Sequence, residues 1–169
     1  MFLLFRVVVS QLLNQYIVIV DFIIAMLWSL SPFGEAKVGI PYGMYNGLNI
    51  YWVFAVCFLS NLLVFPLMIF FLEKINRHFI KWSLYKKIAI YVARRAKLGS
   101  GNKIQKFGFL GLVFFVMIPL PGTGVYAGSI ATYLFRIEKQ KAFIANAIGI
   151  FFSSVIIWTT TLLSMKSFV

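Results

Sequence analysis

Acidic residues are scarce in this chain. Its 169 residues include only four Asp and Glu against 16 Lys and Arg, together with one cysteine and one histidine. A single cysteine excludes an internal disulfide, and His78 has no companion ligands for a metal site. The sequence also lacks a phosphate-binding glycine loop, a dinucleotide fingerprint and a recognisable pair of nucleophile and base. We therefore expect no metal, no cofactor and no enzymatic activity.

Apolar residues dominate what remains. They make up 62% of the chain, whereas roughly half is usual for soluble proteins. Four stretches carry almost no charge, and each is long enough to cross ~30 Å of hydrocarbon: residues 7–31, 50–72, 107–135 and 142–165. The sequence predicts an all-α integral membrane protein with a single membrane domain over residues 1–169. Whether residues 1–15 span the membrane or lie at its interface stays open.

Positive charge is concentrated between the second and third stretches. Residues 73–106 hold ten Lys and Arg against the single acid Glu73. The positive-inside rule predicts that this basic loop is cytoplasmic, in a multi-pass protein of the cell membrane. Its apolar stripes favour two helices on the inner membrane surface with a turn near Ser83, and a solvated linker is the alternative. Because the loop is tethered to membrane segments at both ends, we expect anionic lipid as its partner and no nucleic acid.

The third stretch is interrupted near its middle. A straight helix over residues 107–135 would be roughly 43 Å long, and it would contain the sequence PLPGTG at residues 119–124. Two prolines and two glycines do not continue a helix. Irregular backbone at membrane depth is tolerated only inside protein or beside water, so we expect a re-entrant helical hairpin with its tip at this break.

A similar break follows the first stretch. Ser31 to Glu35 reads as a helix start, with Ser31 as the cap and Pro32 at the first helical position. Ile17 to Leu30 would form the descending limb, and Glu35 to Asn46 would form the returning limb, which would kink at Pro41. This is a second candidate re-entrant hairpin.

The two halves of the chain match when the sequence is shifted by 85 residues. Gly39 and Gly43 then fall on Gly124 and Gly128, and the two asparagines Asn61 and Asn146 also coincide. Only one complete crossing separates the two hairpins, so the copies would be upside down relative to each other. We interpret residues 16–72 and 107–166 as an inverted repeat, a device of transporters, although a glycine-rich apolar chain also gives chance matches.

Two segments resemble a known family. The sequence EAKVGIPYG at residues 35–43 and the sequence PLPGTG at residues 119–124, followed by Tyr126 to Gly128, are similar to the two signature segments of the small multidrug export protein family. That family is distantly similar to the DedA, or VTT, superfamily, and the resemblance covers about residues 31–165. It implies transport, and the DedA relatives point to the flipping of polyprenyl phosphate or other lipids. The family usually has arginine where this chain has Lys37, which puts a bidentate clamp in doubt.

Charges inside the membrane are the strongest functional candidates. Glu35 and Lys37 would lie at membrane depth, where such groups are costly and are functional by default. The half-helices returning from both tips would bring positive helix ends together, which favours an anion. Lys37 would then hold a phosphate and Glu35 would exchange a proton. A buried pair that only fastens the hairpins is the alternative, and a role for Asp21 stays open.

The candidate substrate and proton site is therefore drawn from both hairpins. The two asparagines in it are expected to bond to hairpin backbone. The full set is Glu35, Lys37, Gly39, Pro41, Gly43, Asn61, Pro119, Pro121, Gly122, Thr123, Gly124, Gly128 and Asn146.

Three functions fit these features. The first is translocation of a lipid-phosphate carrier, such as polyprenyl phosphate, or of a phospholipid, with proton coupling as an option. The second is proton-coupled efflux of small hydrophobic or cationic compounds, and the third is a membrane assembly factor that transports nothing. Anionic or phosphate-bearing membrane lipids are the expected partners, and small-residue helix faces permit a homo-oligomer. The sequence leaves the substrate, its direction and the coupling ion open.

Overall fold

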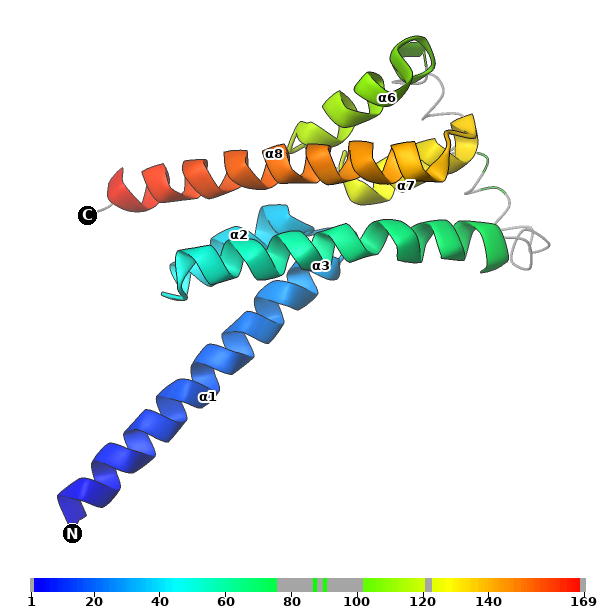
Figure 1. The fold of residues 1–169 in the computed structure, drawn as a ribbon. Helices are drawn as coiled ribbons and strands as arrows, with labels where there is room; N and C mark the ends of the chain where they lie inside the picture. The colour runs from blue at the N-terminus through cyan, green and yellow to red at the C-terminus, as the bar shows by residue number, and fades with distance from the viewer. Residues whose placement is uncertain (1, 76–86, 88–89, 91–101, 121–122, 168–169) are drawn as a thin grey trace.

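The computed structural model describes residues 2–75, 87, 90, 102–120 and 123–167, and every element assigned in those ranges is helical. The predicted all-α class is confirmed. In chain order the elements are α1 (Phe2–Leu30), α2 (Ala36–Tyr45), α3 (Ile50–Phe70), a π-helical turn η1 (Phe71–Ile75), α6 (Asn102–Met117), α7 (Val125–Phe135) and α8 (Lys139–Ser167) (Figure 1).

The helices fall into two length classes. Three of them are long and apolar enough to cross a membrane, over Val9–Leu30, Ile50–Lys74 and Lys139–Ser167. By contrast, α2 has 10 residues and α7 has 11, so each is only about 15 Å long, or half of the hydrocarbon thickness. Helix α6 is interrupted at Gly108, whose backbone is not helical, which leaves a short apolar segment over Gly108–Met117. The chain is thus a membrane protein with both full-length and half-length helices.

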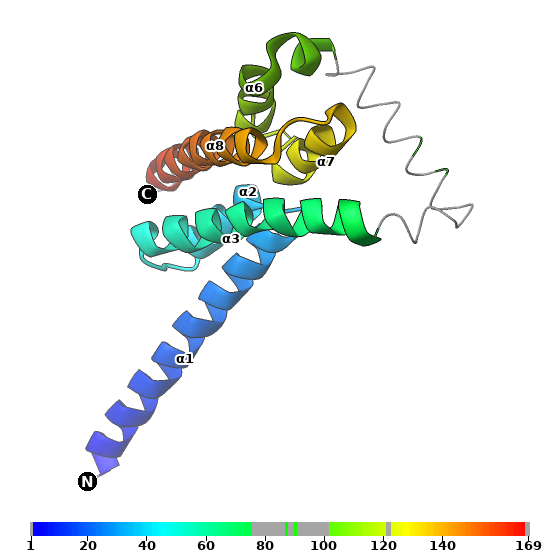
Figure 2. The ribbon, with the colours of Figure 1, turned by 45° about the vertical axis from the view of Figure 1, so that its right-hand side comes forward.

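The long helices α3 and α8 run side by side in opposite directions (Figures 1 and 2). Both short helices pack against both of them: α2 contacts α1, α3 and α8, whereas α7 contacts α3, α6 and α8. Helix α6 contacts α8, and the C-terminal end of α1 contacts α2 and α3. This arrangement brings the chain breaks before α2 and before α7 to the middle of the molecule.

The buried apolar residues form two clusters, and α3 contributes to both. The first joins the end of α1 to α2 and the first half of α3, through residues such as Ala25, Ile40 and Val53. The second joins the remainder of α3 to α6, α7 and α8, through residues such as Val64 and Leu112. The single cysteine, Cys57, is fully buried in the first cluster, in line with a packing role.

Helix α1 projects away from the other helices (Figure 2). Only 11% of its most apolar window is buried, against 39% for each of the other two long helices. Exposed apolar side chains include Leu12, Tyr16, Ile17 and Ile19. Hydrocarbon is the solvent that suits such a surface.

The helix boundaries repeat along the chain. Helices α2 and α3 begin at residues 36 and 50, and α7 and α8 begin at residues 125 and 139, an offset of 89 in both cases. A side chain on Gly39 would meet Cys57, and one on Gly128 would meet Asn146; these contacts are also 89 residues apart. The offset of 85 suggested by the sequence does not align the helix starts, because glycines recur often enough to coincide at a nearby shift.

The predicted returning limb from Glu35 to Asn46 agrees with α2 to within one residue at each end, but the helix start assigned to Ser31 and Pro32 was wrong. The helix begins at Ala36 and not at Pro32, because Glu35 has a left-handed φ of 53° that ends the preceding turn. Ser31 does act as a cap, but of that turn: its Oγ accepts from the Phe33 N–H at 3.3 Å. The helices predicted for the basic loop, the turn near Ser83 and the lone His78 lie outside the described residues.

Candidate functional site

Glu35 is a charged residue in an unusual backbone position. It precedes the first residue of α2, and only 6% of it is exposed. Among the residues that the structure describes, only Glu35 and Arg136 are non-glycine residues with positive φ. A left-handed conformation costs a side-chain-bearing residue roughly 1–2 kcal/mol, so its surroundings hold Glu35 in place.

The Glu35 carboxylate lies at the start of α7. It faces the main-chain N–H of Tyr126, in the first turn of that helix. Gly124 precedes the helix with a φ of 148°, and a Cβ on it would overlap the carboxylate. The first N–H groups of a helix have no partners within the helix, and the helix dipole favours an anion there. Glu35 therefore supplies that anion from the other half of the chain.

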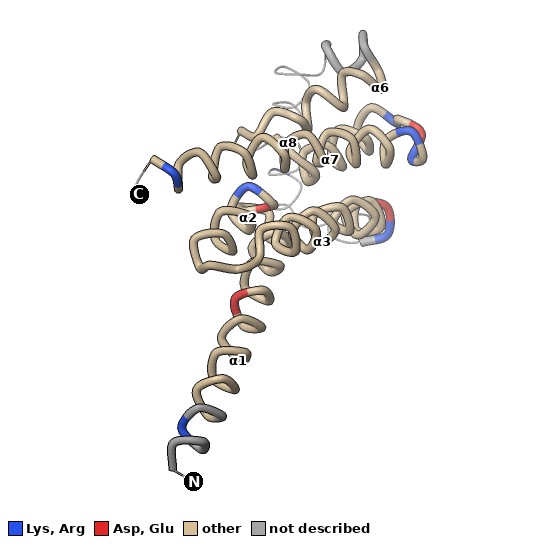
Figure 3. Tube along the Cα trace, turned by 60° about the vertical axis from the view of Figure 1, so that its left-hand side comes forward, with Lys and Arg blue, Asp and Glu red and all other residues tan. Residues whose placement is uncertain are grey.

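Lys37 links the same two breaks. Its Nζ lies 3.2 Å from Glu35 Oε2 and donates to the carbonyl oxygens of Leu120 at 2.8 Å and Thr123 at 2.6 Å. These three acceptors match the three donors of an ammonium group. The lysine side chain is 17% exposed and the glutamate side chain 8%. The pair is thus nearly enclosed, and Figure 3 shows it as one blue and one red segment at the start of α2.

The break before α7 is folded around Thr123. Its Oγ1 donates to the carbonyls of Ile118 at 2.5 Å and Leu120 at 2.9 Å, and it accepts the Leu120 N–H at 3.2 Å. These bonds fix the local chain so that two carbonyl groups face Lys37. Of the predicted tip residues, Pro121 and Gly122 lie outside the described part of the chain.

A cavity of about 340 Å³ adjoins the ion pair. This volume is at the lower end of the range for ligand sites. Glu35 and Lys37 contribute charged groups to it, and Pro119 and Tyr126 contribute the opposite break and helix. The lining residues are Pro32, Phe33, Gly34, Glu35, Lys37, Val38, Pro119, Tyr126, Ala127 and Ile157.

Three glycines of the predicted site serve close helix packing. A Cβ on Gly39 would meet Ser29 and Ala25, one on Gly43 would meet Val53, and one on Gly128 would meet Asn146. The remaining predicted position in α2, Pro41, is half-buried within the helix. These residues hold α2 and α7 against their neighbours and do not line the cavity.

The two buried asparagines behave differently from the prediction. Asn146 donates its side-chain amide to Ala142 of its own helix at 2.8 Å, not to hairpin backbone. Its Oδ1 lies where a Cβ of Gly128 would be, which leaves room only for a weak Cα–H contact. Within the described ranges, the Oδ1 atoms of Asn61 and Asn146 have no hydrogen-bond partner.

Sequence reasoning did not single out two of the residues that complete the site. Tyr126 contributes its main-chain N–H to Glu35, and its hydroxyl donates to the Leu30 carbonyl at the end of α1. Leu120 contributes only its main-chain carbonyl oxygen. Because every residue has this group, the sequence does not indicate which one is used. A tyrosine two residues after the PLPGTG segment was the one available sign. The open candidate Asp21 accepts from Tyr42 at 2.9 Å.

The described residues contain no group of three or more His, Cys, Asp and Glu that could hold a metal ion. A family model with the description "Putative small multi-drug export protein" matches residues 35–156. The match begins at Glu35, covers the ion pair and both α7 and the break before it, and ends within α8. Neither a curated protein nor a solved structure matches the chain.

Proposed function

Because the chain belongs to the Putative small multi-drug export protein family, we propose that it is a transporter whose substrate is a lipid-linked phosphate. Polyprenyl phosphate or a phospholipid headgroup has the required chemistry. The observation that carries this proposal is the enclosed pair of Glu35 and Lys37, which joins two chain breaks beside a cavity. Charged groups inside a membrane protein mark substrate and proton pathways.

The proposed membrane arrangement has two re-entrant hairpins of opposite orientation. In this arrangement α1 and α2 enter and leave on one side, α6 and α7 on the other, and α3 and α8 cross completely. The half-length of α2 and α7 supports it, as does the shared offset of 89 residues. So does the packing, because each half-helix contacts both full crossings. Inverted repeats with broken helices place transporter sites near the membrane midplane.

In the proposed mechanism Glu35 occupies the place of the substrate phosphate. Its carboxylate is bound by the Lys37 ammonium and by the Tyr126 N–H, the same donors that a phosphate group would use. When Glu35 takes up a proton it loses its charge, and both donors become available to the substrate. Loss of that proton restores the internal pair and releases the substrate. Transport would then depend on a pH gradient.

Efflux of organic cations is the second candidate, and one observation favours it. Lys37 Nζ lies among three oxygen atoms, from Glu35, Leu120 and Thr123. A positively charged substrate would compete with Lys37 for this group of acceptors. The two candidates differ in the sign of the substrate charge, so they make opposite predictions for the two charged residues.

Charge-removing variants in liposomes test both candidates. With a fluorescent polyprenyl phosphate as substrate, we expect Lys37→Gln to lose binding and flux. Glu35→Gln should retain binding but lose its dependence on a pH gradient, because its side chain cannot exchange a proton. If the substrate is a cation, Glu35→Gln instead loses binding of a fluorescent organic cation. Wild-type liposomes with no flux of either probe would favour an assembly factor that transports nothing.

A melting assay on the same variants distinguishes a role of Glu35 and Lys37 in transport from a purely structural role of the ion pair. Removing one partner of a buried pair costs about 3–5 kcal/mol, because the other charge is left unpaired. A purely structural pair therefore predicts that both single variants melt early and that the double glutamine variant recovers both stability and flux. Lys141→Gln is the matched control, since it breaks an exposed pair with Glu138 worth at most about 1 kcal/mol.

A further inference from the structure

Two adjoining cavities lie where the ends of α3 and α7 meet the start of α8. The first, of about 590 Å³, is lined by Ile69, Glu73, Thr132, Tyr133, Leu134, Arg136, Ile137, Glu138 and Lys139. The second, of about 640 Å³, is lined by Phe65, Pro66, Ile69, Phe70, Glu73, Lys139, Gln140, Phe143 and Ile144. They share Ile69, Glu73 and Lys139, and neither includes a residue of the Glu35–Lys37 site.

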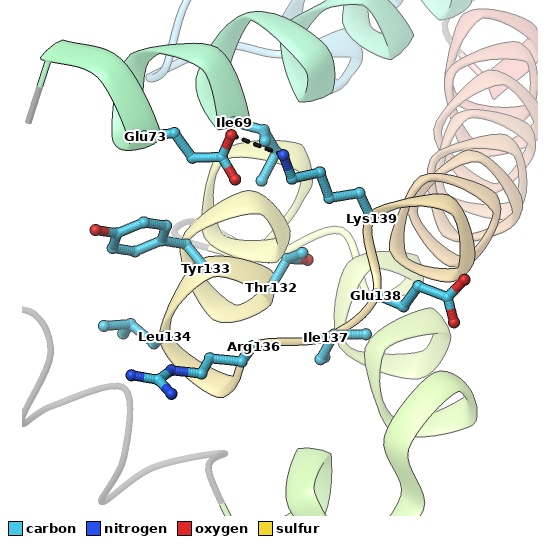
Figure 4. Close-up of a pocket in the computed structure, with 9 residues that line it drawn as sticks. All are labelled: Ile69, Glu73, Thr132, Tyr133, Leu134, Arg136, Ile137, Glu138 and Lys139. Atoms are coloured by element: carbon cyan, nitrogen blue, oxygen red, sulfur yellow. Dashed lines mark hydrogen bonds and ion pairs between the residues drawn. The ribbon is translucent and has the colours of Figure 1, made fainter.

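The two cavities differ in chemical character. The first is bordered by the charged side chains of Glu73, Arg136, Glu138 and Lys139 (Figure 4). The second is bordered mainly by aromatic and aliphatic side chains from α3 and α8. A polar hollow that continues into an apolar groove fits a molecule with a charged head and a hydrocarbon tail.

Among the described charged residues at the polar end, one basic side chain, that of Arg136, is not paired with an acidic side chain. Lys139 pairs with Glu73 at 2.7 Å, and Lys141 pairs with Glu138 at 2.8 Å. Within the described part of the chain, Arg136 forms no ion pair. Figure 4 shows Glu73 and Arg136 at opposite ends of the group, with Thr132 and Tyr133 between them. The polar end therefore carries a surplus positive charge that an anion would neutralise.

Arg136 is also held in a costly backbone conformation. It ends α7 with φ 53° and ψ 40°, and its N–H bonds to the Thr132 carbonyl. Helices that end in a left-handed residue usually place glycine there, because a side chain at such a position costs roughly 1–2 kcal/mol. Strained positions of this kind are concentrated at functional sites. Here the strain keeps an exposed guanidinium group at the edge of the cavity.

We propose that this pair of cavities binds an anionic glycerophospholipid of the surrounding membrane. Its phosphate would lie beside Arg136, the cation that is not paired with an acid, and one acyl chain would lie in the groove between α3 and α8. Basic pockets between transmembrane helices bind anionic headgroups in this way. The apolar groove favours a lipid over a soluble anion. This site is separate from the Glu35–Lys37 pair, and its assignment does not depend on the transported substrate.

Native mass spectrometry of the full chain in detergent tests the site. We expect phosphatidylglycerol to bind about tenfold more tightly than phosphatidylcholine, because both carry the phosphate but only the choline headgroup adds a cation, which the surplus positive charge would repel. Arg136→Gly should remove this preference. Lys166→Gln is the matched control, because it removes an exposed basic residue at the other end of α8, and it should keep the preference.

The glycine variant also has a readout that does not involve lipid. Without lipid, Arg136→Gly should melt at a higher temperature than the wild type, because the left-handed position suits glycine. Arg136→Asn, which also tolerates that conformation, provides a second uncharged variant. A wild-type preference for phosphatidylglycerol in both variants would overturn the proposal. Competition by inorganic phosphate at concentrations equal to that of the lipid would overturn the assignment to a lipid, because the tail would then contribute nothing.

Discussion

Gly124 and Glu35 depend on each other at the scale of single residues. The glycine leaves a space at the start of α7, and the carboxylate fills it. The same space would accept the phosphate oxygen of a substrate, because helix starts bind anions of either kind. In the proposed function, the Glu35 carboxylate therefore competes with the substrate phosphate for this space. Protonation of Glu35 would weaken that competition and begin transport.

Replacing Gly124 with alanine tests this dependence. The added Cβ would overlap the Glu35 carboxylate, so we expect the ion pair to be displaced, at a cost of about 3 kcal/mol or more in the free energy of unfolding. The variant should melt early and transport poorly. Gly47→Ala is the matched control, because Gly47 also has a positive φ, of 73°, but no atom lies within 4 Å of the added carbon.

We expect Gly47→Ala to lower the free energy of unfolding by only roughly 1–2 kcal/mol, which is the cost of the left-handed backbone conformation. Thermal melting and liposome flux measured on both variants give the comparison. Equal losses in the two would show that Gly124 is needed for its backbone alone.

The charged residues of the site could be predicted, but most of their partners could not. Glu35 and Lys37 stand out because charge is rare in apolar segments. The Leu120 and Thr123 carbonyls and the Tyr126 N–H belong to groups that every residue carries. Only the packing of one chain half against the other selects them. The predicted bonds of Asn146 failed for the same reason, since a nearby carbonyl on its own helix was the closer acceptor.

At the scale of helices, both ends of the half-length helix α7 depend on residues outside it. The first turn of α7 receives its acceptor from Glu35. The end of α7 depends on a left-handed Arg136. Prolines and glycines in the sequence predicted the existence of both breaks correctly. The helix start assigned to Ser31 and Pro32 was wrong, because Glu35, a poor candidate for positive φ, adopts it and delays the helix to Ala36.

Helix α2 is tied to α1 by one side-chain bond, from the Tyr42 hydroxyl to Asp21 Oδ1 at 2.9 Å. Tyr42→Phe removes the donor and leaves a half-buried carboxylate without it, so we expect a loss of about 1–3 kcal/mol in the free energy of unfolding. Tyr45→Phe is the matched control, since the Tyr45 hydroxyl bonds to Ser164 in an exposed position. Chemical denaturation compares the two variants.

Flux through the same variants decides whether Asp21 acts in transport. If the aspartate only fastens α1, flux per folded molecule is unchanged in Tyr42→Phe and in Asp21→Asn. Loss of flux in Asp21→Asn at normal stability would make Asp21 a second proton carrier.

At the scale of the whole molecule, composition alone identified a helical membrane protein, because no soluble fold buries so much apolar surface. The lengths of α3 and α8 followed from the uncharged stretches. The projection of α1 could not be predicted from these stretches. The length and apolar character of a helix do not show whether protein or lipid surrounds it.

Cysteine labelling tests the proposed inverted arrangement. In a Cys57→Ala background, we expect Asn46→Cys to react only from outside, and Lys87→Cys and Gln140→Cys only from the cytoplasm. All three positions are exposed. A complete crossing over residues 107–135 would place Lys87 and Gln140 on opposite sides, which would contradict a re-entrant hairpin. Asn46 and Gln140 on the same side would contradict the single crossing by α3.

The bonds of Lys37 also bear on how the protein is made. Its acceptors Leu120 and Thr123 lie 83 and 86 residues further along the chain. At about 5–20 residues per second, a ribosome needs roughly ten seconds to synthesise that distance. If the first half enters the bilayer as it is made, its ammonium group lacks two of its three acceptors during this time. We then expect the translocon, lipid headgroups or water to take the place of the second half until it is made.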